Sequence, residues 1–102
     1  MKKEKIIFIQ NKKDGSEKKA KQSRKKVIKT FKKLVKNYPD NNEIAKKLIK
    51  ILPNVDKVII PEDDLNRNNT YILCEINDGT IYMEIPRCHK ICWNKLKEFS
   101  NN

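Results

Sequence analysis

The sequence predicts one small α+β domain over residues 1–102, with the element order β-α-α-β-β-β-α and three or four mainly antiparallel strands covered by helices. A chain of 102 residues has room for one modest core. Apolar residues at helical spacing extend through residue 38, and two segments of alternating apolar residues flank Asp78-Gly79. We expect residues 1–37 to form a basic strand and a long helix, and residues 40–99 to form a helix, three strands and a C-terminal helix.

The first two elements follow from the residues before Tyr38. Lys5 to Gln10 contains four consecutive apolar residues, which predicts a buried strand closed by Asn11 to Gly15. Ser16 is then a candidate N-cap, with Glu17 in the first turn of a long amphipathic helix. The apolar positions of this helix are Ala20, Val27, Ile28, Phe31, Leu34, Val35 and Tyr38.

A row of lysines lies opposite that apolar stripe on the predicted helix. At about 100° per residue its members fall within an arc of roughly 60° and span about 27 Å. Like charges three and four residues apart destabilise a helix unless an anion neutralises them. The row therefore predicts contact with a polyanion. Its members are Lys18, Lys25, Lys29, Lys32 and Lys36, flanked by Lys21, Arg24, Lys26 and Lys33.

A second helix follows the break at Tyr38-Pro39. Asp40 and Glu43 resemble a capping box that opens this helix, which we expect to extend through Leu52. The two helices are predicted to form an αα-hairpin.

The remaining strands and the last helix are predicted from alternation and turn residues. Val55 to Ile60 is a strand candidate, and an acidic loop follows it. Asp78-Gly79 is the signature of a two-residue type I′ hairpin. That turn predicts three apolar pairs on one face, Ile76 with Ile81, Cys74 with Met83 and Ile72 with Ile85. Arg87 to Phe99 is a predicted terminal helix with an apolar face of Cys88, Cys92, Leu96 and Phe99.

The charge of the chain is concentrated in its first third. Residues 1–36 contain 15 lysines and arginines against 3 acidic residues, whereas the other residues contain 9 against 10. The 21 lysines, 12 asparagines and 14 isoleucines indicate AT-rich coding, which explains lysine content but not its one-sided placement. A segment of this kind is typical of proteins that bind nucleic acid. No apolar run is long enough for a membrane span and no signal sequence is evident, so we expect a cytoplasmic protein.

Candidate chemical sites are less specific than the lysine row. Three cysteines and one histidine (Cys74, Cys88, His89 and Cys92) match the ligand count of a zinc site but lack a CxxC knuckle, and core packing explains the thiols. Glu75 and Glu84 share a hairpin face but lack the lysine that a metal-dependent nuclease pattern requires. We therefore expect no cofactor, no metal and no catalytic residue, and favour a non-enzymatic protein.

The predicted order of elements resembles two families in topology. Residues 41–99 resemble a double-stranded RNA-binding domain, with Arg87, His89, Lys90 and Lys95 near the lysine cluster that opens its last helix. The full order resembles RelE/ParE-type toxins, which implies messenger RNA cleavage. On that resemblance the candidate residues are Arg67, Tyr82, Arg87, His89 and Lys90.

The sequence thus favours a small basic protein that binds RNA or DNA through phosphate contacts, as a regulatory or accessory factor of a phage or mobile element. An alternative is an anti-CRISPR-like protein inhibitor of a host nucleic-acid enzyme. Tyr71, Leu73 and Tyr82, exposed on the outer face of the hairpin, could supply its protein contact. A RelE/ParE-like ribonuclease is a further alternative.

Overall fold

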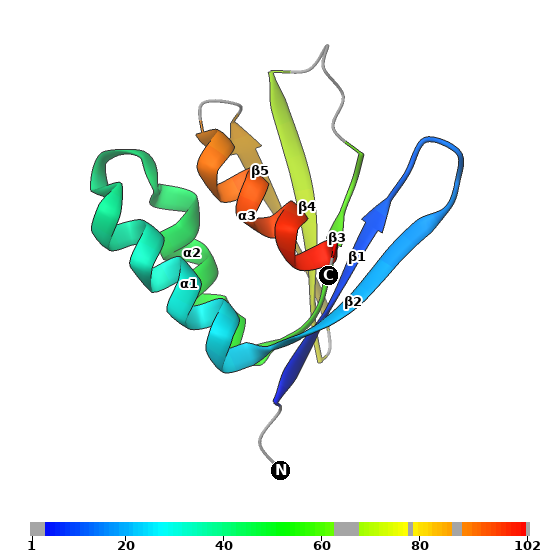
Figure 1. The fold of residues 1–102 in the computed structure, drawn as a ribbon, viewed down its shortest axis with the longest axis horizontal. Helices are drawn as coiled ribbons and strands as arrows, with labels where there is room; N and C mark the ends of the chain where they lie inside the picture. The colour runs from blue at the N-terminus through cyan, green and yellow to red at the C-terminus, as the bar shows by residue number, and fades with distance from the viewer. Residues whose placement is uncertain (1–3, 63–67, 78, 87–88, 102) are drawn as a thin grey trace.

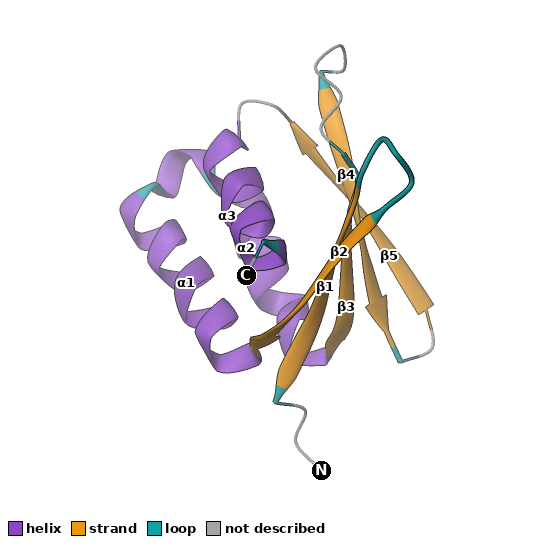
Figure 2. Ribbon diagram, turned by 45° about the vertical axis from the view of Figure 1, so that its right-hand side comes forward, coloured by secondary structure: helices purple, strands orange, loops and turns teal. Residues whose placement is uncertain are grey.

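The computed structural model describes residues 4–62, 68–77, 79–86 and 89–101. It confirms the α+β class, with three α-helices on one face of a five-stranded sheet (Figure 1, Figure 2). The elements are β1 (Lys5–Asn11), β2 (Glu17–Ser23), α1 (Arg24–Asn37), α2 (Glu43–Ile51), β3 (Val55–Ile60), β4 (Asn69–Ile76), β5 (Gly79–Pro86) and α3 (Lys90–Ser100). Short 3-10 turns, Pro39–Asn41 and Leu52–Asn54, precede and follow α2.

The sheet has the strand order β2-β1-β3-β4-β5. Strands β1 and β3 are parallel, and all other neighbouring strands are antiparallel. A parallel pair needs a long crossover connection, which here consists of β2, α1 and α2. The sheet is therefore mixed and has one strand more than the upper limit we expected.

The additional strand is β2, and it corrects the predicted start of the first helix. Glu17–Ser23 forms an antiparallel hairpin with β1, in which Ala20 pairs with Phe8 and Gln22 with Ile6. Gly15 closes the turn with a φ of 84°, in the left-handed region that favours glycine. The predicted N-cap role of Ser16 is therefore wrong, because Ser16 lies in this turn and binds the Asp14 carboxylate.

Helix α1 begins at Arg24, eight residues after the predicted cap. Its N-cap is Ser23, whose Oγ accepts a hydrogen bond from the backbone N–H of Lys26 (3.4 Å). The helix ends before Pro39, as predicted.

Asn42, rather than the predicted Asp40–Glu43 box, joins α1 to α2. Asp40 lies in the preceding 3-10 turn, and α2 has no side-chain cap. The buried amide of Asn42 donates hydrogen bonds to the carbonyls of Leu34 (3.1 Å) and Tyr38 (2.8 Å), so it satisfies the carbonyls at the C-terminal end of α1.

The β4–β5 hairpin forms with a register two residues away from the predicted one. Ile76 pairs with Gly79, Cys74 with Ile81 and Ile72 with Met83. Gly79 thus lies in β5 and not in the turn, while Asp78 is outside the described residues. A shift of two residues preserves the faces, since side chains alternate with a period of two. Ile72, Cys74, Met83 and Ile85 are accordingly buried together, as expected.

Helix α3 packs its apolar face on β1 and α1. The centre of the Phe99 ring lies 5.3 Å from the centre of the Phe8 ring and 6.1 Å from that of the Phe31 ring. The buried Gln22 side chain on β2 donates a hydrogen bond to the Phe99 carbonyl (3.1 Å). Cys92, Leu96 and Phe99 are buried as predicted, and Cys88 lies outside the described residues.

Candidate nucleic-acid interface

Helix α1 presents four exposed lysines on one side. Lys25, Lys29, Lys32 and Lys36 follow one another at spacings of three and four residues, opposite the buried Val27, Phe31 and Leu34. From the first to the last they span about 16 Å at 1.5 Å per residue. We call these four residues the lysine row.

The row is shorter than the one predicted from the sequence because Lys18 is not on the helix. Lys18 lies on β2, where it pairs with Gln10 of β1, and is on the helix-covered side of the sheet, as are Ala20 and Gln22. Lys21 lies on β2 as well, but on the opposite side of the sheet. Both are exposed, and the structure does not align them with the row.

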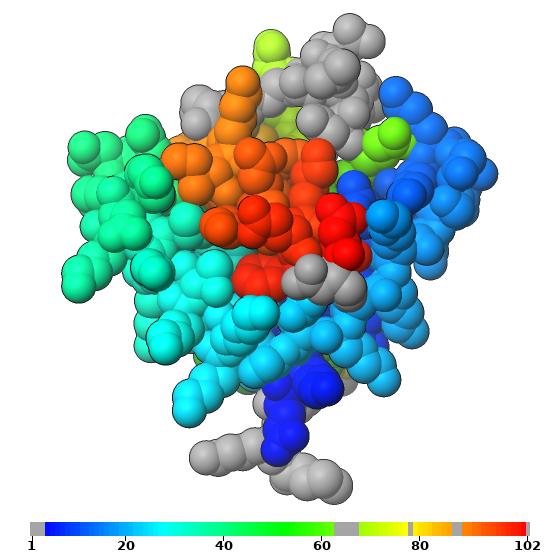
Figure 3. Space-filling model, in the orientation of Figure 1, coloured from blue at the N-terminus to red at the C-terminus, as the bar shows by residue number. Residues whose placement is uncertain are grey.

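Two other predicted residues, Lys26 and Lys33, are exposed on a flank of α1 next to the row. Lys33 lines a depression of about 360 Å³ together with Lys95 of α3. Lys95 was not among the lysines assigned to this surface, because its proximity depends on how α3 packs. In Figure 3, α1 in cyan and β2 in blue form adjoining surface next to α3.

Arg24 is a correction to the predicted contact set. It is only 7% exposed, and its guanidinium donates hydrogen bonds to the carbonyls of Leu52 and Lys5. Burial lowers the pKa of Arg24, and the negative charge of Asp56 opposes that shift. Arginine stays protonated under such conditions, so Arg24 is a buried cation that ties the start of α1 to β1 and to the end of α2.

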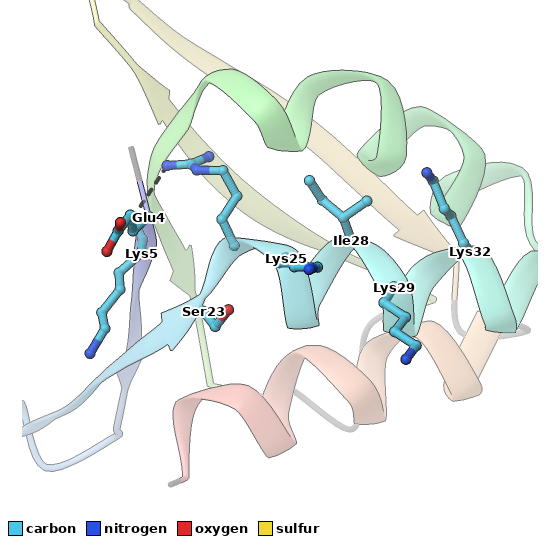
Figure 4. Close-up of a pocket in the computed structure, with 8 residues that line it drawn as sticks. Glu4, Lys5, Ser23, Lys25, Ile28, Lys29 and Lys32 are labelled. Atoms are coloured by element: carbon cyan, nitrogen blue, oxygen red, sulfur yellow. Dashed lines mark hydrogen bonds between the residues drawn. The ribbon is translucent and has the colours of Figure 1, made fainter. Parts of the chain in front are cut away.

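A groove of about 740 Å³ lies beside three members of the row, Lys25, Lys29 and Lys32 (Figure 4). Lys5 at the start of β1 lines this groove, and Ile28 contributes apolar surface to it. The other residues that line it are Glu4, Ser23 and Arg24. Lys5 joins this surface only because β1 lies next to the β2–α1 junction, which the sequence alone does not show.

The lysine row differs electrostatically from three lysines elsewhere in the chain, which form ion pairs. Lys46 pairs with Glu43 (3.3 Å), Lys57 with Glu75 (3.5 Å) and Lys95 with Glu98 (3.1 Å). Helix α1 contains no acidic residue, and within the described residues no carboxylate pairs with any member of the row. The positive charge of the row is therefore open to an external anion.

The second candidate surface lies on the sheet face opposite the helices, which we call the open side of the sheet. Strand pairing places Ile9, Ile59, Leu73 and Tyr82 side by side across four strands. Tyr71 and Tyr82 are 44% and 72% exposed, and Leu73 is partly exposed between them. Strand β1 lies within the sheet and does not cover this face (Figure 2).

Metal and thiol chemistry gain no geometric support in the part of the chain that the structure describes. No group of three or more cysteine, histidine, aspartate or glutamate side chains gathers there. Burial raises the pKa of both Cys74 and Cys92 to about 12, which disfavours the thiolate that a nucleophilic reaction requires. The ring of His89 contacts the Asn41 carbonyl instead, and Cys88 lies outside the described residues.

The residues implied by the family resemblances are only partly described. Arg67 and Arg87 fall outside the described residues. Tyr82 lies on the open side of the sheet, whereas His89 contacts Asn41 near the helices, so the described toxin candidates do not form one cluster. Of the two glutamates weighed for a nuclease site, Glu75 forms an ion pair with Lys57, and Glu84 accepts a hydrogen bond from the Asn69 amide.

Comparison of the chain with protein-family models, with curated proteins and with solved structures finds no match to any of them. None of the described helices is long and apolar enough to cross a membrane. The argument for function therefore depends on the geometry and charge of the surface.

Proposed function

We propose that this protein binds nucleic acid through contacts between the lysine row on α1 and phosphate groups. One observation carries the proposal: four exposed lysines share one side of a helix that contains no acidic residue, and within the described residues none of them has an acidic partner. The phosphate backbone is the polyanion that most often binds such a surface.

The chemistry of lysine defines what kind of recognition the row can provide. An ammonium group is a point charge without the planar fork with which arginine reads guanine, so the row supports affinity rather than base specificity. Four phosphate contacts on duplex DNA give a slope of about −3.6 for log K against log salt concentration, or about −2.8 on a single strand. Affinity for duplex DNA should thus fall roughly 150-fold between 50 and 200 mM salt.

The test is direct binding of the purified protein to short single-stranded and double-stranded RNA and DNA. The variant Lys29→Gln/Lys32→Gln removes half of the row. The matched control Lys12→Gln/Lys13→Gln removes the same charge from exposed positions in the β1–β2 turn. The proposal expects a large loss of affinity for the row variant and a small one for the control, and equal losses would contradict it.

The open side of the sheet favours a second candidate function, inhibition of a nucleic-acid enzyme by direct protein contact. Tyr71 and Tyr82 are exposed there among Glu75 and Glu84, and exposed tyrosines are enriched at protein interfaces. The lysine row would then occupy the nucleic-acid channel of the enzyme. In either case we place the protein in the cytoplasm, as a factor of a phage or mobile element. Absence of nucleic-acid binding together with inhibition of a purified nucleic-acid enzyme would favour this candidate.

A further inference from the structure

The two edges of the sheet differ in how they are protected. Each edge strand leaves one row of backbone N–H and C=O groups without a neighbouring strand, and lysines on an edge strand oppose further pairing. Edge strand β2 carries Lys18, Lys19 and Lys21, all exposed. Edge strand β5 contains no lysine or arginine, and Glu84 is its only charged residue.

Strand β5 also exposes apolar side chains on both faces. Tyr82 projects from the open side, and Ile81, 40% exposed, projects from the helix-covered side. A groove of about 380 Å³ lies between α2 and β5, with apolar walls from Ile44, Ile51 and Met83. Lys47 and Lys50 of α2 also line this groove, but they belong to the helix and not to the edge strand. Within the part of the chain that the structure describes, the edge of β5 thus combines backbone groups that have no strand partner with exposed apolar side chains on both faces.

We propose that β5 pairs with β5 of a second copy of this chain, antiparallel about a two-fold axis, to form one continuous sheet from both copies. The backbone requires a strand as the occupant, because only a strand supplies alternating donors and acceptors along the whole edge. A second copy fits better than a foreign strand because pairing the two unprotected edges leaves only lysine-bearing β2 strands at the ends of the joined sheet. The assembly therefore closes at two copies.

The same pairing buries the exposed side chains and leaves the lysine row free. In this antiparallel pairing, the open side of one copy continues into the open side of the other. Tyr82 therefore contacts the second copy's β5 on the open side, while Ile81 and Met83 contact it on the side of the helices. Helix α1 packs against α2 and does not border β5. Each dimer carries two lysine rows, although the inference does not depend on what the rows bind.

The oligomeric state tests this inference. Light scattering after size exclusion, at high salt and over a range of concentrations, should give twice the chain mass of 12.1 kDa. The variant Thr80→Lys/Tyr82→Lys places on β5 the protection that β2 carries, at two exposed positions, and should be monomeric. The control Asn37→Lys/Tyr38→Lys adds the same charge at exposed positions at the C-terminal end of α1 and should remain dimeric.

A measurement on the unaltered protein removes any dependence on how the variants fold. Hydrogen exchange of the β5 amides should slow as protein concentration rises, while exchange of the β2 amides should not change with concentration. A protein that stays monomeric at every concentration overturns the proposal. So does a dimer that persists in Thr80→Lys/Tyr82→Lys, or one that shows no concentration-dependent protection of β5.

Discussion

Replacing Arg24 with methionine should lower the free energy of unfolding by about 3 kcal/mol. Methionine keeps much of the apolar stem but removes the guanidinium donor from the carbonyls of Leu52 and Lys5, of which the Leu52 carbonyl retains the backbone N–H of Val55. Each unmade bond to a charged donor costs about 1 to 3 kcal/mol, and Asp56 loses a nearby positive charge. Burying the Arg24 cation is itself unfavourable, so its removal offsets part of this cost. The expected net loss is therefore about 3 kcal/mol rather than the full sum of the two bonds.

The assay is urea unfolding followed by circular dichroism. At a slope of about 1 to 1.5 kcal/mol per molar urea for a domain of this size, the midpoint should fall by about 2 to 3 M. Arg24→Lys should lower the free energy of unfolding by roughly half as much as Arg24→Met, because one ammonium group cannot bond both carbonyls as the planar guanidinium does. The adjacent, exposed Lys25→Met should change stability by less than about 0.5 kcal/mol. If Arg24→Met is no more destabilising than Lys25→Met, the assignment of Arg24 to the fold rather than to the surface is refuted.

Three further predictions follow from local features. Burial raises the thiol pKa of Cys74 and Cys92 to about 12. In a Cys88→Ser variant, both thiols should therefore resist alkylation at pH 8 until urea unfolds the chain. Equal alkylation rates in the folded and unfolded protein would contradict this prediction. Gly15→Ala should cost about 1 kcal/mol in urea unfolding because of its φ of 84°, whereas Gly79→Ala, with no left-handed φ and no atom within 4 Å, should cost much less. Phe99→Ala should destabilise the fold by about 3 to 5 kcal/mol, and a loss below 1 kcal/mol would show that α3 is not part of the core.

Periodicity predicted the elements that bury many apolar residues. The stripe of Val27, Phe31 and Leu34 gave α1 its correct face, and the alternation of β4 and β5 gave that hairpin its correct faces despite the shifted register. The register was wrong because the Asp78-Gly79 signature placed glycine in the turn, whereas Gly79 pairs with Ile76. Turn chemistry is a local preference, and packing of the buried residues against the helices can override it.

Strand β2 could not be predicted from its own residues. Glu17–Ser23 contains lysine, glutamate, alanine and glutamine, which favour helices, yet it forms an edge strand because β1 supplies hydrogen bonds and α3 covers Ala20 and Gln22. The one signal for it was Asp14-Gly15, a dipeptide typical of hairpin turns. It follows the apolar run that became β1.

The candidate site was predictable only where it depends on one helix. The spacing of Lys25, Lys29, Lys32 and Lys36 places them together on any helix that contains them, so their row follows from the sequence. The groove beside Lys5 and the burial of Arg24 depend on β1 and on the 3-10 turn after α2, which lie far away in the chain. Contacts of that kind have no periodic signature.

The salt dependence of nucleic-acid binding tests the central claim most directly. On short duplex DNA the unaltered protein should give a slope of about −3.6 for log K against log salt, and Lys29→Gln/Lys32→Gln should reduce it to about −1.8. The control Lys12→Gln/Lys13→Gln should retain the full slope. A flat salt dependence, or the same slope in the row variant and the unaltered protein, would contradict the assignment of α1 as the nucleic-acid interface.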